Sequence, residues 1–516
     1  MNPPQPVRLW RVVFPVIVLY LAVAVFFVRH GALNPDEGFY AAAARAVFAG
    51  EMPYRDFGYT QTPLFPYVNG LVLCVTGSGL FEQRAVNGLW GGLALWLATW
   101  WVARRASVAA ALLLAALFGL SSPWMYFTHL GKTYAFTGLV AVLASWVWLE
   151  WPAGIKKSAA LGLLGVIGVG CRLPSVPFFG MLWLASLWDS HRPSRAHLLG
   201  AGAALVAALA GLILPFYLLA PKASVFWVLE YHRISVPLRF WHLAWQEIAT
   251  LAPALWLATL GATGIVLAKR GTSERREVVL GATALLALVA NLLPQGVYEE
   301  YGVPFLLPLA MAVTVVLHRQ LEGSAKVLGG AVVTVLLTVH LLATPLILWR
   351  DFPNRRLGLS QWLTPNAPPL NAALPAQIQQ GRQLVQALVP AGQPVIGPNL
   401  ILALEAGRPI PANLRMGPFA VGDDHLPLPP AQLHLATPAE IESYVSDPAV
   451  PLLVFFKRPV LNYGWTMPTG RQLPADLSAR WLEIYRRDFV IVDQEGEFLL
   501  LARPAALPPG TVIRPQ

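Results

Sequence analysis

Charged residues are scarce in this sequence, at 12% of its 516 residues, whereas 56% are hydrophobic. An ordinary soluble domain has about 25% charged residues. At half that share, most of the chain has no surface suited to water, which excludes a soluble fold. Apolar runs close to the roughly 20 residues that a helix needs to cross a bilayer recur along the sequence. We therefore expect a polytopic α-helical membrane protein.

Cysteine is nearly absent as well: Cys74 and Cys171 are the two in the chain, and both lie in apolar stretches. A C-terminal region outside the cytoplasm would therefore fold without disulfides. In no suitable context does the sequence contain a zinc-ligand spacing, a Walker loop, a Gly-x-Ser-x-Gly motif or a dinucleotide fingerprint. The function has to be sought in other residues.

The net charge of +10 could suggest a nucleic-acid partner. However, the basic residues lie in short pairs at the ends of apolar runs, the pattern that sets membrane orientation. A nucleic-acid surface would gather them on one face with aromatic residues between them. We therefore expect no nucleic-acid partner. The 19 Trp residues fit the belts found at membrane interfaces.

The apolar runs and their flanks predict about eleven spans, at 11–29, 84–103, 106–123, 133–150, 158–172, 174–189, 197–219, 248–268, 277–294, 303–318 and 327–349. Lys and Arg fall on alternate connections, which predicts a multi-pass protein of the cytoplasmic membrane with its N-terminus inside and its C-terminus outside. A break is expected at Cys171–Pro174, because Pro cannot continue a helix and Arg is costly at mid-bilayer. One long kinked helix is the alternative, and it would invert everything downstream.

Three segments face outward in this topology: 30–84, 221–247 and everything after Arg350. We predict a transmembrane catalytic domain at 1–349, a Pro-rich linker at 350–375 and a small exocytoplasmic α/β domain at 376–516.

The predicted α/β domain has several local signals. Thr437-Pro438-Ala439-Glu440 is a capping box that begins a helix. Segments 489–493 and 498–502 flank a polar turn as a hairpin. The remaining expected elements are helices at 376–388 and 399–406 and strands at 394–397 and 452–456.

The first outward segment holds Asn34-Pro35-Asp36-Glu37-Gly38-Phe39-Tyr40. Asn is a good N-cap, Pro suits a first helical turn, and acidic residues there complement the helix dipole. A helix is expected through Ala41–Phe48, with one apolar side that could lie along the membrane interface. Two carboxylates at a helix start are most often ordinary capping residues, so the motif alone does not establish a site.

The rest of this segment adds Pro53-Tyr54-Arg55-Asp56-Phe57 and Gln61-Thr62-Pro63-Leu64-Phe65-Pro66-Tyr67. Together these stretches resemble the first exocytoplasmic loop of GT-C glycosyltransferases, with the bacterial glycosyltransferase family 39 proteins as the nearest branch. These proteins are related to protein O-mannosyltransferases and to aminoarabinose transferases. The likeness in architecture spans nearly the whole chain, and the motif match covers residues 36–67.

The resemblance implies that an acceptor hydroxyl attacks a sugar carried on a polyprenyl phosphate. An acidic residue then serves as general base or helps to hold a divalent metal such as Mg²⁺ or Mn²⁺. That residue corresponds to Asp36, with Glu37 second, and Asp36 is also the candidate metal ligand. Tyr40 belongs to the same motif. Gln61 and Thr62 stand where the aminoarabinose branch has an acidic-basic pair, and Asp56 could replace the missing acid.

An anionic donor needs cationic partners, and two lie near the outward ends of spans. Lys132 follows His129 in Thr128-His129-Leu130-Gly131-Lys132, and Arg172 sits at the predicted break. An ionisable residue at membrane depth is a functional candidate because it is costly there. Snorkelling of Lys132 to the interface is the alternative. Tyr301, within Tyr298-Glu299-Glu300-Tyr301, could also line a donor groove.

The predicted function is thus glycosyl transfer from a lipid-linked sugar to a protein or glycolipid acceptor. A transporter or flippase would show polar residues at mid-span, broken helices in both halves and an internal repeat. The spans here are apolar to their middles, and no repeat is visible. A non-catalytic scaffold that displays the α/β domain would not need the acidic first loop.

Overall fold

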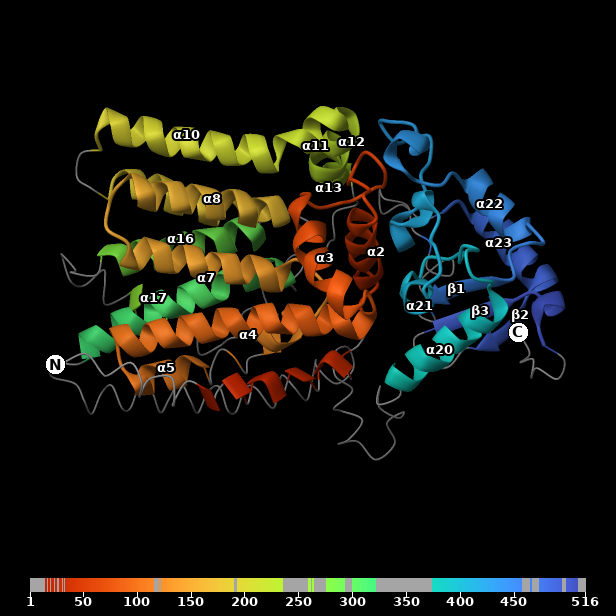
Figure 1. Ribbon diagram of the computed structural model, residues 1–516, viewed down its shortest axis with the longest axis horizontal. Coiled ribbons are helices and arrows are strands. Elements are labelled where there is room, and N and C mark those ends of the chain that lie inside the picture. The colour runs from red at the N-terminus through yellow and green to blue at the C-terminus, as the bar shows by residue number, and fades with distance from the viewer. Residues whose placement is uncertain are drawn as a thin grey trace. The chain divides into compact units, whose positions relative to one another are not determined.

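The computed structural model describes most of the chain between residues 14 and 508 (Figure 1). The residues outside the description are 1–13, 16, 19, 23, 26, 30, 32, 116–118, 120–121, 190–192, 235–258, 261, 264–274, 293–298, 322–373, 457–464, 466–472, 494–497 and 509–516. The chain forms two compact units. Unit 1 comprises 1–31, 85–213 and 237–368, and unit 2 comprises 32–84, 214–236 and 369–516.

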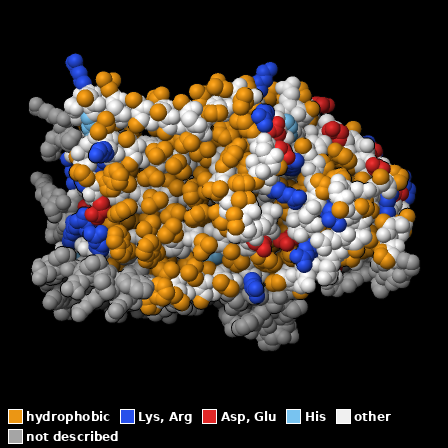
Figure 2. All heavy atoms as spheres, in the orientation of Figure 1, with side chains coloured by type: hydrophobic (Ala, Val, Ile, Leu, Met, Phe, Trp, Pro, Cys, Tyr) orange, Lys and Arg blue, Asp and Glu red, His pale blue; other side chains and the backbone are white. Residues whose placement is uncertain are grey.

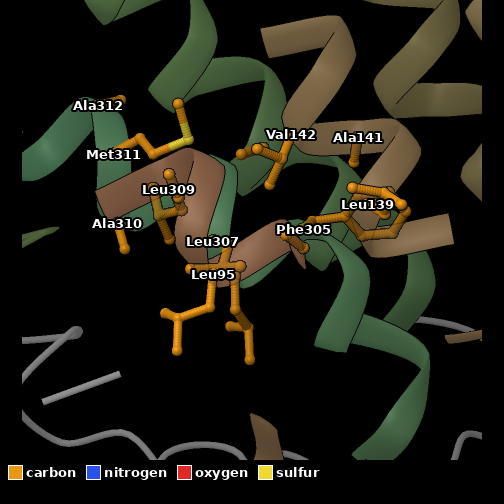
Figure 3. Packing of buried hydrophobic residues seen from close by; sticks show 14 of the residues in the cluster. Leu95, Leu139, Ala141, Val142, Phe305, Leu307, Leu309, Ala310, Met311 and Ala312 are labelled. Carbon is orange, nitrogen blue, oxygen red and sulfur yellow. The ribbon is translucent and has the colours of Figure 1, made fainter. Parts of the chain in front are cut away.

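Unit 1 is a bundle of helices. Its described members are most of α4 (Leu80–Arg105), then α5 (Val108–Leu114), α6 (Ser122–Phe127), α7 (Tyr134–Glu150), α8 (Ile155–Cys171), α9 (Val176–Leu187), α10 (Arg195–Leu212), α16 (Arg275–Leu292) and α17 (Val303–Leu321). Helices α7, α8 and α10 run side by side in Figure 1. Leu95, Leu139, Phe305 and Met311 meet in the buried core between α4, α7 and α17 (Figure 3).

Apolar side chains also cover the face of this bundle that Figure 2 shows. On α10, Leu199 and Val206 are 74% and 63% exposed, which would be unfavourable in water but suits a hydrocarbon surrounding. Among the described residues, Arg195–Leu212 and Glu300–Arg319 are long and apolar enough to span a bilayer, and a bent pair of helices could add a third. The total of about eleven spans stays a prediction, and the expected span at 327–349 lies outside the described residues.

The chain breaks between α8 and α9, as the sequence predicts. Helix α8 ends at Cys171, Arg172 is extended with φ −155°, and a short 3-10 turn at Leu173–Ser175 leads into α9. The two helices pack against each other, so the break reverses the chain. One long kinked helix is therefore excluded.

The basic connections of unit 1 gather at one end of the bundle. Lys157 Nζ lies 2.7 Å from the Asp189 carboxylate, and the Arg276 guanidinium lies 2.7 Å from the same group. Arg276 also donates hydrogen bonds to the carbonyls of Leu149 and Trp151 at the end of α7. Lys157 and Arg276, from two of the predicted basic connections, thus lie together, while the alternation of all connections and the side of the membrane that this end faces stay predictions.

Unit 2 joins segments that are far apart in the sequence. Its helices are α2 (Glu37–Phe48), α3 (Leu64–Thr76), α11 (Leu214–Leu219), α12 (Pro221–Val225), α13 (Tyr231–Ile234), α20 (Leu374–Leu388), α21 (Ile401–Glu405), α22 (Pro438–Ser446) and α23 (Ala475–Asp488). A π-helical turn, Phe226–Glu230, links α12 and α13. Helix α2 packs against both α3 and α21, so the first outward segment and the C-terminal region form one core. These units divide the chain differently from the predicted domains, and the predicted linker lies largely outside the described residues.

A small antiparallel sheet forms the centre of the C-terminal region, in the order β1-β3-β2 (Leu452–Phe456, Phe498–Ala502 and Val490–Asp493). The expected hairpin is present as β2 and β3, and the capping box of Thr437 and Glu440 forms at the start of α22. The strand expected at 394–397 is reduced to one bridge between Ile396 and Leu453. The sequence analysis also missed α23.

The expected interfacial role of α2 is wrong for most of its apolar side. The structure buries four residues of this side, Tyr40, Ala43, Ala44 and Val47, and leaves the fifth, Phe48, exposed. The reason is the close approach of α3: a Cβ at Gly70 would lie 2.9 Å from the Ala44 carbonyl oxygen. Helix α2 is therefore a core helix of unit 2.

The approach of Gly397 to β1 predicts a specific weakness. Gly397 has φ +148°, and a Cβ there would lie 2.0 Å from the Val454 carbonyl oxygen. We expect Gly397→Ala to destabilise the C-terminal region by at least about 1–3 kcal/mol. The positive φ strains an alanine backbone, and the Val454 carbonyl already occupies the space that the new methyl group would need. Gly392→Ala is the matched control, since Gly392 also has positive φ but faces open space. Limited proteolysis of the full chain against temperature measures the difference, and equal melting of the two variants would contradict the expectation.

Candidate functional site

Asp36 stands on a tight turn at the start of α2. The Asp36 amide donates to Asn34 Oδ1 at 3.0 Å, and the Glu37 amide donates to the Asn34 carbonyl at 3.1 Å. The Asn34 amide in turn donates to Glu37 Oε2 at 3.0 Å. Asn34 thus orders the turn through an Asx-type bond, three residues before the helix begins at Glu37. Asp36 is partly exposed, whereas Glu37 is buried.

Glu37 forms a bidentate ion pair with Arg84. The guanidinium donates through Nε to Oε1 at 2.7 Å and through Nη2 to Oε2 at 2.6 Å, with both side chains at most 1% exposed. Gln83 donates a further hydrogen bond to the Glu37 carbonyl at 3.1 Å. A fork-to-fork pair of this kind fixes orientation as well as charge. The pair therefore ties the Asp36 turn to the start of α4.

The two adjacent acids thus differ in their surroundings. Glu37 is neutralised and enclosed, which suits a positioning role, while Asp36 keeps access to its surroundings and is the better candidate for a group that takes a proton. Their catalytic roles stay predictions.

Residues 50–62 form a compact loop that the C-terminal region holds. Tyr54 has the unusual φ of 69°, and its carbonyl accepts a hydrogen bond from His434 Nε2 at 3.1 Å. The Tyr54 hydroxyl donates to the Gln61 carbonyl. Tyr40 lies beneath this loop, with its ring stacked on Phe39 at 4.3 Å. Gln61 therefore contributes its backbone to the loop, and Tyr40 contributes packing.

Asp56 is engaged within the same loop. Its carboxylate pairs with Arg55 at 2.6 Å and accepts the Met52 amide at 2.7 Å. The hydrogen bonds from Arg55 hold the pKa of Asp56 below its ordinary value. Asp56 is thus an ionised residue that shapes the loop, and nothing in these contacts marks it as a second base.

A second group of candidates lies in unit 1. Lys132 is 4% exposed, and its Nζ lies 3.2 Å from Glu300 Oε1. Snorkelling is therefore excluded for Lys132, because the ammonium is enclosed and paired. Glu300 belongs to a 3-10 turn, Glu299–Gly302, directly before α17.

Arg172 lies in the same cluster. Its guanidinium stands 4.5 Å from the centre of the Tyr134 ring and 4.6 Å from that of Tyr301. Its Nη1 donates to Thr133 Oγ1 at 3.4 Å, and the side chain is 2% exposed. Contacts with the faces of two aromatic rings favour a planar cation at this position. The sequence-predicted residues Lys132, Arg172 and Tyr301 are therefore brought together.

His129 occupies the turn that leads to Lys132. Its ring is buried against Tyr20 and Phe27, at centroid distances of 5.7 and 5.8 Å, and Nδ1 bonds to the Met125 carbonyl. Gly88 leaves the space for it, since a Cβ there would lie 2.9 Å from the imidazole. His129 thus shapes the turn that carries Lys132.

Sequence reasoning missed Arg84 and gave Glu300 little weight. Arg84 could have been found by the argument applied to Lys132, because it is a cation at the end of a span where charge should be scarce. The pairing of Arg84 with Glu37 could not have been predicted from the sequence, since 47 residues separate them.

No group of three or more His, Cys, Asp or Glu side chains able to hold a metal occurs among the described residues. A metal at Asp36 stays a prediction from the resemblance.

The Glu37–Arg84 pair generates a stability prediction. Arg84→Met should destabilise the protein by about 3–5 kcal/mol, because it leaves a buried carboxylate without its cation. The double variant Glu37→Leu/Arg84→Met should recover most of that loss, since an apolar pair of similar volume removes the uncompensated charge. Thermal melting in detergent measures both, with Arg480→Met in an exposed pair as the control. A double variant as unstable as the single one would contradict the argument.

Comparison with known proteins identifies solved structures with a similar fold. No protein-family model matches the chain, and no curated protein matches it by sequence. Two crystal structures of ArnT from Cupriavidus metallidurans, one bound to undecaprenyl phosphate and one in the apo state, are similar to it with TM-scores of 0.58. Their sequences are 15% and 16% identical to this one, over 96% of this chain and 99% of the ArnT chain. The chain therefore has the fold of ArnT, a GT-C aminoarabinose transferase and polytopic membrane protein, as the first outward segment predicted.

Proposed function

We propose that this protein transfers a glycosyl group from a polyprenyl-phosphate-linked sugar to an acceptor hydroxyl at the outer face of the cytoplasmic membrane. The observation that carries the proposal is the partly exposed Asp36 carboxylate on a turn held by the buried Glu37–Arg84 pair. A carboxylate fixed in this way can act on a substrate without the loop having to reorganise. The shared fold with ArnT supports the same class of reaction.

In the proposed step, the acceptor oxygen attacks the anomeric carbon of the donor. The bond between that carbon and the phosphate oxygen breaks, and the polyprenyl phosphate leaves with the bonding electrons. The hydroxyl proton passes to the Asp36 carboxylate, which must be ionised to accept it. The reaction thus yields a glycosylated acceptor, a polyprenyl phosphate and a protonated base.

The donor phosphate would be held by Lys132 and Arg172. Arg offers a planar fork for phosphate oxygens, and Lys acts as a point charge. Both are buried, so their charge is screened little by solvent. In the ArnT crystal structure the bound lipid is undecaprenyl phosphate, a polyprenyl phosphate of the kind that the proposed step releases. Tyr301 would support the site by holding the Arg172 guanidinium.

The proposal includes the topology predicted from the sequence, with an exocytoplasmic C-terminal domain and about eleven spans. The acceptor would be a protein or a glycolipid, and the sugar a hexose or pentose. A divalent metal at Asp36 would add positive charge near the reacting centre.

Asp36→Asn should abolish transfer while leaving the fold intact. Removing a general base costs about 10²–10⁴-fold in rate. The assay uses purified protein in nanodiscs, radiolabelled polyprenyl-phosphate sugars and host membrane extract as acceptor. Asp424→Asn, an exposed acid of the C-terminal region, is the control and should keep full activity. Transfer that survives Asp36→Asn would reject Asp36 as the base, and absence of both turnover and donor binding in the wild type would favour a transporter or flippase.

Lys132→Gln and Arg172→Gln should each weaken the binding of undecaprenyl phosphate about 10- to 100-fold, because each removes a charge-assisted contact worth about 1.5–3 kcal/mol. Lys222→Gln, at an exposed position, should leave the affinity unchanged. Binding to protein in nanodiscs is measured with a fluorescent lipid. Wild-type affinity in both substituted proteins would remove the donor-phosphate role from this cluster.

A further inference from the structure

A strained contact joins the C-terminal region to the loop at residues 50–62. Among the described residues, Tyr54 and His434 are the two non-glycine residues with positive φ, at 69° and 55°. They belong to one contact, because His434 Nε2 lies 3.1 Å from the Tyr54 carbonyl oxygen. The carbonyl can only accept, so Nε2 is the donor. Left-handed backbone is costly for such residues and persists only where the surroundings hold it, most often at functional sites.

Two further contacts hold the same loop. Arg415 forms an ion pair with Glu51, with side chains 19% and 29% exposed. A Cβ at Gly58 would lie 2.8 Å from the Trp227 ring and 3.0 Å from the Leu433 carbonyl oxygen, so the loop backbone packs closely against both. Together with the strained contact, the C-terminal region therefore touches the loop at three points.

The loop in turn packs against the first turn of α2. The buried Tyr59 ring meets the rings of Phe39 and Tyr40 at centroid distances of 6.4 and 6.1 Å. Phe39 also meets Phe419 of the C-terminal region at 6.4 Å. The Tyr40 amide donates to the Asp36 carbonyl at 3.3 Å, so a shift of this turn moves Asp36 as well. The loop is therefore part of the surface that fixes the position of Asp36.

We infer that His434 is a positioning residue for the proposed transfer: it holds the loop through the Tyr54 carbonyl, and the loop holds Asp36 in the orientation that takes the acceptor's proton. The inference rests on the proposed function, which makes Asp36 the base. A misplacement of about 1 Å at a reacting group can lower a rate about 100-fold, so a bond remote from the reacting atoms affects the rate. The C-terminal region thus contributes to the rate of transfer rather than to donor binding.

The experiment compares His434→Leu with His434→Gln in the full-length protein in nanodiscs. Both new side chains are unbranched at Cβ, so the left-handed backbone strains them alike, but Gln keeps an N–H donor for the Tyr54 carbonyl. His434→Leu should lower kcat per folded molecule about 10- to 100-fold with the donor KM unchanged, and His434→Gln should recover most of that loss. His425→Leu, at an exposed position of the same region, is the control and should keep the wild-type kcat.

His434→Asn keeps the inference testable if His434→Leu does not fold. Asn adopts the left-handed conformation readily, so the backbone strain at this position should not rise. Its amide nitrogen does not extend as far as the imidazole Nε2, so the bond to the Tyr54 carbonyl is lost. The kcat should therefore fall as in His434→Leu, while the melting temperature in detergent stays close to that of the wild type.

Hydrogen exchange gives a second readout that does not require turnover. In His434→Leu, the amides of the loop and of the first turn of α2, including that of Tyr40, should exchange about tenfold faster than in the wild type. Gly58→Ala should give the same pattern without removing a polar group, because its methyl group must displace the Trp227 ring or the loop. Gly202→Ala, which faces open space, is the matched control and should leave these amides unchanged.

The outcomes separate this inference from the proposed function. Absence of transfer by the wild type would remove the proposed function, and the inference with it. Wild-type transfer with an unchanged kcat in His434→Leu and His434→Asn would overturn the inference alone. Equal losses in His434→Leu and His434→Gln would also overturn it, because the bond to the carbonyl would then have no effect. Faster exchange confined to the loop, with the first turn of α2 as slow as in the wild type, would do the same.

Discussion

Water is excluded from most of this protein, and every charge placed inside it must be balanced by another group. An ion without water costs several kcal/mol even after the surroundings relax, so a buried charge persists only where a partner holds it. Three groups of described residues show this balance. Glu37 meets Arg84, Lys157 and Arg276 share Asp189, and Lys132 meets Glu300.

These pairs do different things because their charge balance differs. The Glu37–Arg84 pair is complete in charge and geometry, and it fixes a turn. The cluster at Asp189 has two cations on one acid, and it joins the ends of α7, α8, α9 and α16. The cluster at Lys132 brings Lys132 and Glu300 together with Arg172, whose guanidinium lies over the rings of Tyr134 and Tyr301.

The sequence predicted much of this arrangement because membrane proteins obey strong local rules. Helix lengths, the break at Arg172 and the positive connections follow from hydrophobicity, proline and charge, and all are read from neighbouring residues. The hairpin and the capping box at Thr437 are local for the same reason. The packing of α2 was not fully predictable, because α21, which also packs against it, comes from a segment hundreds of residues away. Periodicity identifies an apolar face but not the surface that covers it.

The candidate site shows the same limit. Asp36, Lys132 and Arg172 were identifiable as residue types in unusual places. Their partners were not, because Arg84 lies 47 residues from Glu37 and Glu300 lies 168 residues from Lys132. The free-energy cost of burying a charged side chain can be argued from that residue alone, whereas the partner that offsets this cost is brought to it by the fold. A sequence therefore shows where a charged residue is costly to bury, but it does not show which residue pairs with it or what role it has.

The common core of α2 and α21 has a consequence for biogenesis. Helix α2 ends at Phe48 and α21 begins at Ile401, so the ribosome must add roughly 350 residues before the two can meet. At about 5–20 residues per second this takes about 20–70 s. Throughout that interval the turn that bears Asp36 lacks one of the surfaces that will enclose its helix. A chain released early would therefore expose part of α2 and present it to quality-control proteases.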